Sequence, residues 1–223
     1  MRLLTYPDRD LLVAAVTDAI ATDLTAALRQ KDRASLCLPG GTSPAPVFEM
    51  LSGVNLDWGR VCCFATDERW LPLDHPRSNA GLIRRHMLKN EAKDTEFIPF
   101  FSDMDMPEPA MDGLIAALSP YLPISVLLLG MGADMHIASL FPRGDRLAEA
   151  MSAEAPVLIP IRAPEAEEVR VTLSARILRD AMATHVLITG KDKRESLEKA
   201  QELPAEIAPI KAVLANATVH WAE

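Results

Sequence analysis

Short apolar runs alternate along the chain with segments in which apolar residues recur at helical spacing. The clearest run, residues 124–129, has five branched apolar residues among six and leads straight into Gly130-Met131-Gly132. We predict strands at residues 34–38, 60–65, 96–100, 124–129, 157–161, 169–173, 185–189 and 219–221, the last as an edge strand. We predict helices at residues 10–30, 44–51, 78–88, 108–118, 174–182 and 192–201.

Continuous apolar strands separated by helices are typical of a mostly parallel sheet with helices on both faces. The predicted fold is therefore α/β, with three layers and a Rossmann-like sheet. A chain of 223 residues is long enough for one such core and short for two, so residues 1–223 are predicted to form a single domain. Apolar residues make up 49% and charged residues 24%, as in ordinary globular proteins.

Composition and charge narrow the classes of partner. No uninterrupted apolar run approaches the roughly 18 residues of a membrane-spanning helix. Residues 1–10 carry charges and a proline and lack the apolar centre of a secretion signal. A net charge of −8 does not suit the nucleic-acid backbone, which calls for a basic surface. We predict a cytoplasmic protein, monomer or homodimer, that binds neither membranes nor nucleic acids.

The three cysteines, Cys37, Cys62 and Cys63, all lie in apolar segments predicted to be strands. None forms a C-x-x-C pair, and an odd number argues against a disulfide framework. Free cysteines are among the most buried residue types, so we predict three buried structural thiols.

Glycine-rich and polar segments follow several of the predicted strands. They cover residues 39–43, 66–70, 130–136 and 190–193. In parallel α/β sheets, ligands bind outside the carboxyl ends of the strands. These segments are therefore expected to meet on one rim of the sheet and to form a site.

The first segment, Gly40-Gly41-Thr42-Ser43, joins a strand to a helix that Thr42 or Ser43 is expected to cap. Glycines let the backbone approach a ligand, and the free N–H groups at a helix start bind phosphate or carboxylate. The G-K-[ST] ending of a Walker phosphate loop is absent. The alternative that these glycines serve only the turn stays open.

The second segment contains Asp67, Glu68 and Arg69, followed by Trp70. Two acids and an arginine at a strand end are costly to bury unless they pair or meet a ligand. Arginine suits bidentate binding of phosphate. A surface ion pair packed beside Trp70 is the alternative. Residues that either contact the ligand or only brace the loops are Glu68, His75, Ser78, Asn79 and Arg162.

The third segment places Asp134 and His136 two residues apart in a loop after the clearest strand. A carboxylate can fix the tautomer of an imidazole and raise its basicity, which makes histidine a general base near neutral pH. A dinucleotide-binding G-x-G-x-x-G turn is excluded, because Asp134 and Met135 stand where the last glycine should be.

These segments together resemble the signature blocks of the glucosamine-6-phosphate isomerase/6-phosphogluconolactonase family, and in particular of its 6-phosphogluconolactonases. The blocks are G-G-T-S-P from Gly40, D-E-R-W from Asp67 with a later S-N, and L-G-M-G-A-D-M-H-I-A-S-L-F-P up to Pro142. R-V-T-L from Arg170 and T-G-K-D-K up to Lys193 extend the resemblance, which covers roughly residues 8–221.

The resemblance implies a fold shared with sugar-phosphate deaminases and isomerases, and hydrolysis of 6-phosphoglucono-δ-lactone. It implies His136 as general base, Asp67 and Arg69 as the active-site acid and arginine, and Arg170 and Lys193 as cations for the substrate phosphate. A lactone is an activated ester, so we expect neither a metal nor an organic cofactor. Either Asp134 or Asp67 is expected to orient the imidazole. The oxyanion is expected at the N–H groups of residues 40–42 or 130–132.

Departures from the family pattern keep two other functions open. The family usually has glycine where this chain has Met135, and a positive φ there would strain methionine. A sugar-phosphate sensor without catalysis would follow if that strain disabled the loop. Deaminases of the family share H-I-A but carry a glutamate five residues after the histidine, where this chain has Phe141. Phenylalanine moves no proton, which favours the lactonase.

Overall fold

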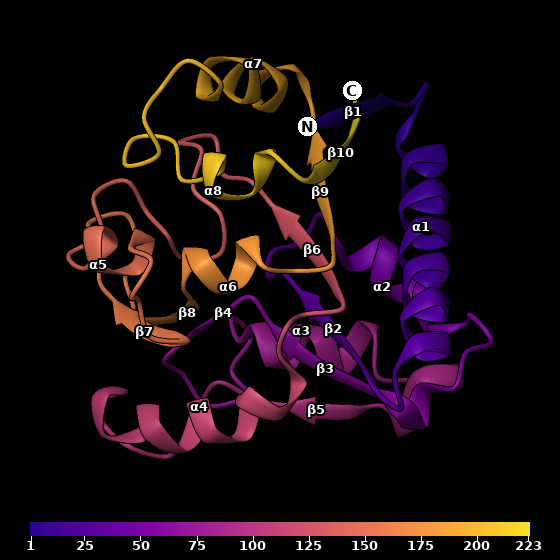
Figure 1. Cartoon of the computed structure of the whole chain (residues 1–223), viewed down its shortest axis with the longest axis horizontal. Coiled ribbons are helices and arrows are strands. Elements are labelled where there is room, and N and C mark those ends of the chain that lie inside the picture. Colours follow the sequence, from indigo (N-terminus) through magenta and orange to yellow (C-terminus); the bar gives the residue numbers. More distant parts are fainter.

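Seven parallel strands form the main sheet of this computed structural model, which describes residues 1–223 (Figure 1). Their order across the sheet is β1-β10-β9-β6-β2-β3-β5. The strands are β1 (Arg2–Thr5), β2 (Ala34–Leu38), β3 (Val61–Ala65), β5 (Glu96–Ile98), β6 (Val126–Gly130), β9 (Ala183–Thr189) and β10 (Ala217–Ala222). The predicted parallel sheet is confirmed.

The sheet differs from the prediction at one edge. The strand predicted at residues 219–221 as an edge is β10, which lies inside the sheet between β1 and β9. The true edge strand, β1, has only two apolar residues in four, Leu3 and Leu4, and gives too weak a pattern to stand out. Because β10 has a neighbouring strand on each side, its residues Val219 and His220 are buried.

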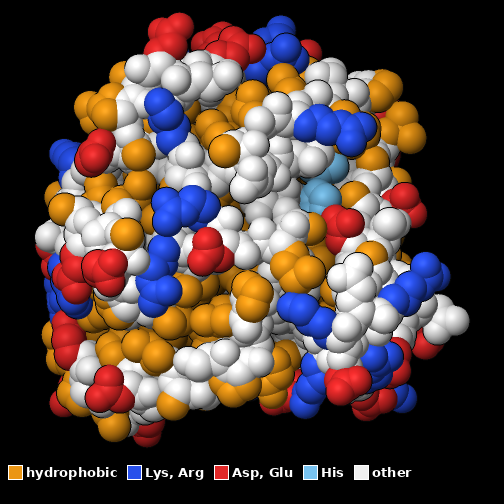
Figure 2. All heavy atoms as spheres, viewed as in Figure 1, with side chains coloured by type: hydrophobic (Ala, Val, Ile, Leu, Met, Phe, Trp, Pro, Cys, Tyr) orange, Lys and Arg blue, Asp and Glu red, His pale blue; other side chains and the backbone are white.

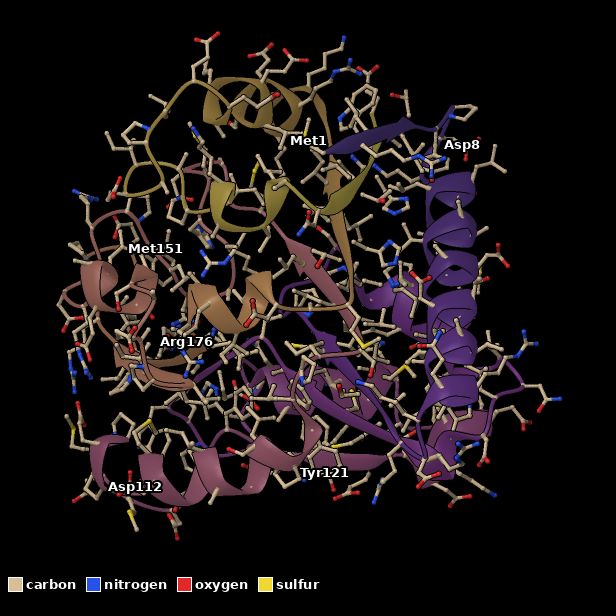
Figure 3. All side chains as sticks on the ribbon, viewed as in Figure 1. Met1, Asp8, Asp112, Tyr121, Met151 and Arg176 are labelled. Atoms are coloured by element: carbon tan, nitrogen blue, oxygen red, sulfur yellow. The ribbon has the colours of Figure 1, made fainter.

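Helices cover both faces of the sheet, which makes the three predicted layers (Figures 1 and 3). One face carries α1 (Arg9–Gln30), α2 (Ala45–Ser52) and α3 (Asn79–His86). The other carries α4 (Met111–Leu118), α5 (Leu147–Met151), α6 (Ala175–Arg179), α7 (Lys191–Ala200) and α8 (Lys211–Leu214). Short 3-10 helices are η1 (Trp58–Arg60), η2 (Asn90–Asp94), η3 (Glu108–Ala110) and η4 (Ser119–Tyr121).

Alternate residues of the central strands serve two separate cores. In β2, Leu36 and Leu38 pack toward α1 and α2, whereas Cys37 packs into the cluster on the opposite face. Successive side chains of a strand point to opposite faces, so a continuous apolar run feeds both cores. Cys62 and Cys63 divide in the same way, and all three cysteines are free and buried as predicted. Burial raises the pKa of the Cys62 thiol to about 12.

A second, three-stranded antiparallel sheet stands beside the main one. It contains β4 (Asp67–Arg69), β8 (Arg170–Leu173) and β7 (Leu158–Ile161), in that order. The strands predicted at residues 157–161 and 169–173 are thus β7 and β8, while β4 falls in a segment expected to be a loop. This small sheet brings residues 67–69 against residues 170–172, a pairing that matters for the site.

Helix α1 is long and apolar enough to span a membrane by length and composition alone. It packs on the sheet through Leu12, Val16, Ile20 and Leu24, all buried in the core. Its start is capped by Asp8, whose carboxylate accepts a hydrogen bond of 2.8 Å from the N–H of Leu11 (Figure 3). Its apolar character therefore has a structural role in this fold.

A chain of hydrogen bonds, buried at its two histidines, joins α1 to the sheet. Asp23 contacts Nε2 of His185 at 2.9 Å, Nδ1 of His185 lies 3.1 Å from Nε2 of His220, and Nδ1 of His220 lies 2.8 Å from the Tyr6 hydroxyl. With both rings neutral, each nitrogen has a matched donor or acceptor, from the Tyr6 O–H to the Asp23 carboxylate. Burial, with His185 and Arg2 nearby, lowers the pKa of His220 to about 4.

We expect this arrangement to make the protein less stable in mild acid. A proton binds His220 more readily in the unfolded chain, so stability should fall as pH drops from about 6.5 to about 4, by up to about 3 kcal/mol. Urea unfolding at pH 7.5, 6.0 and 4.5 measures this loss. In His220→Gln the loss should shrink, whereas His75→Gln, at the surface, should keep it. An unchanged pH slope in His220→Gln contradicts the assignment.

Candidate active site

A cavity of about 390 Å³ opens at the carboxyl ends of the main-sheet strands, where the four polar segments were expected to meet. The predicted site residues that line it are Gly40, Gly41, Ser43, Asp67, Arg69, His136, Arg170 and Lys193. Thr42 and Asp134 do not line it. Asp134 contacts His136, which lines the cavity.

Asp134 and His136 form a close pair at the cavity wall. Oδ1 of Asp134 lies 2.5 Å from Nδ1 of His136, and this hydrogen bond lowers the pKa of the Asp134 carboxyl. An ionised carboxylate only accepts, so Nδ1 carries a proton, and in the neutral ring the lone pair is on Nε2. Asp67 makes no hydrogen bond with His136, so of the two expected orienting acids only Asp134 is in place.

The turn that holds this pair has room for glycine alone at position 132. A Cβ there would lie 2.2 Å from Nδ1 of His136 and 2.4 Å from Oδ1 of Asp134. The N–H of Gly132 donates to the carbonyl of His136 at 3.0 Å, and the N–H of Met135 donates to the carbonyl of Gly132 at 3.0 Å. These two bonds close the turn around the pair.

Met135 adopts the left-handed conformation that its position suggested, with φ of 68°. A non-glycine residue in this region costs on the order of 1 kcal/mol or more. The conformation is held by the bond to Gly132 and by a 3.1 Å hydrogen bond from the N–H of Ile210 to the carbonyl of Met135. Because the Asp134–His136 pair forms beside it, the methionine is accommodated without loss of the pair.

Phe141 packs its ring against the imidazole of His136. The two ring centroids lie 4.6 Å apart at an angle of 45°, and Phe141 is buried and lines the cavity. The group beside the histidine is therefore apolar. It shields one side of the imidazole from water and offers no second acid.

Asp67 is a buried carboxylate fixed by two hydroxyl groups. The Thr66 hydroxyl donates to Oδ1 at 2.8 Å and the Ser139 hydroxyl donates to Oδ2 at 2.6 Å. Sequence reasoning did not single out Thr66 or Ser139, although Ser139 stands in the motif that follows His136 and Thr66 directly precedes Asp67. Both line the cavity, so they belong to the candidate site.

Glu68 braces the loop and does not line the cavity. Its buried carboxylate accepts hydrogen bonds from the N–H groups of Asn79 at 2.8 Å and Ala80 at 2.7 Å, and from the Ser78 hydroxyl at 3.1 Å. These donors lie at the start of α3, where a carboxylate is favourable. Burial nonetheless raises the pKa of Glu68.

The other residues of undecided role are now placed. Asn79 lines the cavity and donates from Nδ2 to the carbonyl of Asp67 at 2.8 Å. His75 and Arg162 lie outside the cavity. Nδ1 of His75 accepts from the N–H of Arg77, and Arg162 pairs with Glu108 at 2.7 Å.

The Gly40–Ser43 turn is shaped by close packing and left with free donors. A Cβ on Gly40 would lie 2.1 Å from Oδ1 of Asn79. Helix α2 starts after Pro44 with no side-chain cap, so the expected cap by Thr42 or Ser43 is absent. None of the N–H groups from Gly40 to Ser43 donates to a protein acceptor, which leaves them available to a ligand.

Three cations border the same cavity. Arg69 and Arg170 are direct partners across the β4–β8 ladder, and Lys193 enters from α7. Burial lowers the pKa of Arg170 and that of Lys193. Nε of Arg170 is buried without a hydrogen-bond partner, so the guanidinium is held ready for an anion. The basic site lies in an acidic protein whose visible face mixes both signs of charge (Figure 2).

Several known proteins are similar to this chain over nearly its whole length. A 6-phosphogluconolactonase of Mesorhizobium japonicum is 38% identical over 97% of this chain and 93% of the relative. A 6-phosphogluconolactonase of Pseudomonas aeruginosa is 38% identical over 91% and 87%. The crystal structure of a 6-phosphogluconolactonase from Shewanella baltica superposes with a TM-score of 0.96 at 29% identity, over 100% of this chain and 98% of that one.

The sequence profile described as "Glucosamine-6-phosphate isomerases/6-phosphogluconolactonase" matches residues 7–221, nearly the whole chain. The structural neighbours have the same mostly parallel α/β fold. The chain therefore belongs to the glucosamine-6-phosphate isomerase/6-phosphogluconolactonase family.

Proposed function

We propose that the protein hydrolyses 6-phospho-D-glucono-1,5-lactone to 6-phosphogluconate, with His136 as general base. The observation that carries this proposal is the Asp134–His136 pair on the wall of a cavity that three cations border. Hydrolysis of a lactone that carries a phosphate group requires a base near the lactone carbonyl and cations that bind the phosphate. Relatives over nearly the full length are named 6-phosphogluconolactonases, which supports the same reaction here.

In the proposed reaction Nε2 of His136 takes a proton from water as the water oxygen attacks C1 of the lactone. Asp134 accepts from Nδ1 and stabilises the imidazolium that forms. The tetrahedral intermediate then expels the ring oxygen, which receives the proton from His136. The C1–O bond of the ring breaks, one water is consumed, and the base returns to its neutral state.

The remaining groups of the site have two tasks. Some stabilise the negative charge that forms on the C1 carbonyl oxygen, and others bind the phosphate. The free N–H groups from Gly40 to Ser43 suit the oxyanion, whereas the N–H of Gly132 is taken by the carbonyl of His136. Arg69, Arg170 and Lys193 suit the phosphate, because arginine binds it bidentately and lysine adds a point charge. Asp67 has no proton-transfer partner here, and we assign it to holding the substrate hydroxyls or Arg170.

The reaction is tested by hydrolysis of freshly prepared lactone, followed with 6-phosphogluconate dehydrogenase and corrected for spontaneous opening. A rate well above the blank, and unchanged by EDTA, is the expected result. A rate equal to the blank, with binding of 6-phosphogluconate retained, would instead favour a sensor without catalysis. We further propose that the enzyme is cytoplasmic and acts as a monomer or homodimer.

Removal of the Arg170 charge should chiefly weaken substrate binding. We expect Arg170→Met to raise KM roughly 10- to 100-fold, because a charge-assisted contact contributes about 1.5–3 kcal/mol. Methionine keeps the apolar stem in its buried place. The matched control is Arg33→Met, which removes an exposed arginine that pairs with Glu96 away from the cavity. Equal KM values in the two variants would contradict the phosphate assignment.

A further inference from the structure

Arg69 and Arg170 face each other across an antiparallel ladder and border one cavity. Like charges directly opposite on neighbouring strands repel each other. The side chain of Arg170 is only 12% exposed, so water screens that repulsion poorly. Some group of the protein must hold the two guanidinium groups in place before any phosphate arrives.

Of the carboxylates that attract Arg170 by charge, Asp67 and Glu168 act most strongly, and of the two only Glu168 lies outside the cavity. Glu168 stands two residues before Arg170, in the bend that leads into β8. Its carboxylate is 11% exposed, and Oε2 lies 3.7 Å from Nη2 of Arg170. That distance allows charge attraction but is too long for a hydrogen bond. Glu168 therefore attracts the guanidinium without using up the N–H donors that a phosphate needs.

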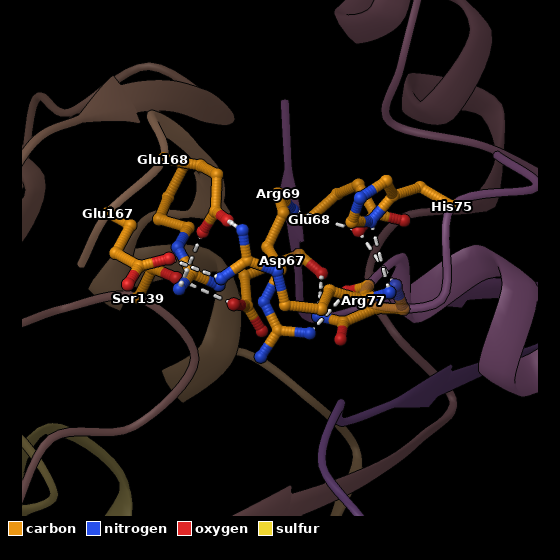
Figure 4. A network of polar contacts seen from close by, with 10 residues as sticks. Asp67, Glu68, Arg69, His75, Arg77, Ser139, Glu167 and Glu168 are labelled. Carbon is orange, nitrogen blue, oxygen red and sulfur yellow. Dashed lines mark hydrogen bonds and ion pairs between the residues drawn. The ribbon is translucent and has the colours of Figure 1, made fainter. Parts of the chain in front are cut away.

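Arg77 connects this carboxylate to the other arginine (Figure 4). Its guanidinium pairs with Oε1 of Glu168 through Nη2, and its backbone carbonyl accepts from Nη1 of Arg69. Arg77 itself lies outside the cavity. The contacts thus run from Arg69 through Arg77 and Glu168 to Arg170, and they cross from the loop before α3 to the loop before β8.

We infer that Glu168, anchored by Arg77, is a positioning residue that orients Arg170 toward the substrate phosphate. The inference rests on the proposed lactonase function and names two residues for that site which do not themselves touch the substrate. Glu168 acts by charge on Arg170, and Arg77 acts by fixing Glu168. The expected consequence is a selective effect on the binding of phosphorylated ligands.

Glu168→Gln tests the role, because it removes the charge and keeps the shape. We expect a roughly tenfold higher KM for the phosphorylated lactone, with kcat within about twofold of wild type. Affinity for 6-phosphogluconate, measured by calorimetry without turnover, should fall by the same factor. Hydrolysis of glucono-1,5-lactone, which lacks the phosphate, should keep its wild-type rate. A general structural defect would lower both reactions.

Glu167→Gln is the matched control. Glu167 pairs with the same Arg77 at 2.5 Å but is 78% exposed and makes no contact with Arg170. It should leave KM unchanged. If Glu168→Gln does not fold, Arg77→Ala replaces it: Arg77 is half exposed, and its loss should raise KM in the same selective way.

The failures of the two proposals are distinguishable. A wild-type protein that does not hydrolyse the lactone overturns the proposed function. A wild-type protein that does, with Glu168→Gln and Arg77→Ala retaining wild-type KM and product affinity, overturns the positioning role alone. An equal rise of KM in Glu167→Gln would also overturn the positioning role, since the total negative charge of the loop would then be the cause.

Discussion

Replacement of His136 with alanine should lower kcat for lactone hydrolysis by about 10²- to 10⁴-fold, the usual contribution of a positioned base. The loss is expected because Asp134 accepts from Nδ1, so that in the neutral ring the lone pair is on Nε2 of a residue that lines the cavity. KM should change much less, since the cations remain. Stopped-flow or coupled assays against the spontaneous rate give both constants.

The control for this variant is His86→Ala, which removes a partly exposed histidine that pairs with Glu49 away from the cavity. It should retain wild-type kcat. Retention of near-wild-type kcat by the His136 variant would refute the role of this residue as base. The hydrolysis would then have to depend on the cations and backbone donors alone.

Replacement of Gly132 with alanine should be nearly as damaging, although position 132 carries no functional group. The added Cβ would lie 2.2 Å from Nδ1 of His136 and 2.4 Å from Oδ1 of Asp134, so the pair must shift. A displacement of about 1 Å in a reacting group can cost roughly 10²-fold in rate. We therefore expect kcat to fall by about 10²-fold, with circular dichroism unchanged.

Gly130→Ala provides a matched control two residues away, at the end of β6, where the residue also lines the cavity. A Cβ there meets nothing within 4 Å, and the same small change of side chain should leave kcat close to wild type. Equal losses in the two alanine variants would mean that backbone flexibility of the turn, and not the space beside the pair, decides the rate. Wild-type kcat in both variants would mean that the imidazole shifts to make room for the added Cβ without any loss of rate.

The loop around His136 combines strain with close packing. Met135 and Ala138 both have positive φ, and the two flank the histidine and the following residue. Strained backbone persists only where surrounding contacts determine it. Here the closing bonds through Gly132 and the hydrogen bond from Ile210 provide those contacts. The loop is thus fixed by its neighbours, which keeps His136 beside Asp134 despite the methionine.

Much of the fold follows from the sequence alone, because it depends on local pattern. Apolar runs in β2, β3, β6 and β9 can be recognised as strands, since each feeds two cores and has no polar residue facing solvent. Parallel strands then place the segments that follow them on one rim. The cavity location, and the gathering there of His136 and Lys193, could therefore be predicted, whereas Arg170 was expected there only from the family resemblance.

Contacts between segments far apart in the chain could be known only from the tertiary structure. All three residues of β4 are charged, and they show no pattern that predicts a strand. Its pairing with β8 nevertheless places Arg69 opposite Arg170. The same applies to the choice of Asp134 over Asp67 beside His136, and to the exclusion of Thr42 from the cavity. Local periodicity reports burial, whereas side-chain partners depend on how separate elements pack, which a single sequence does not encode locally.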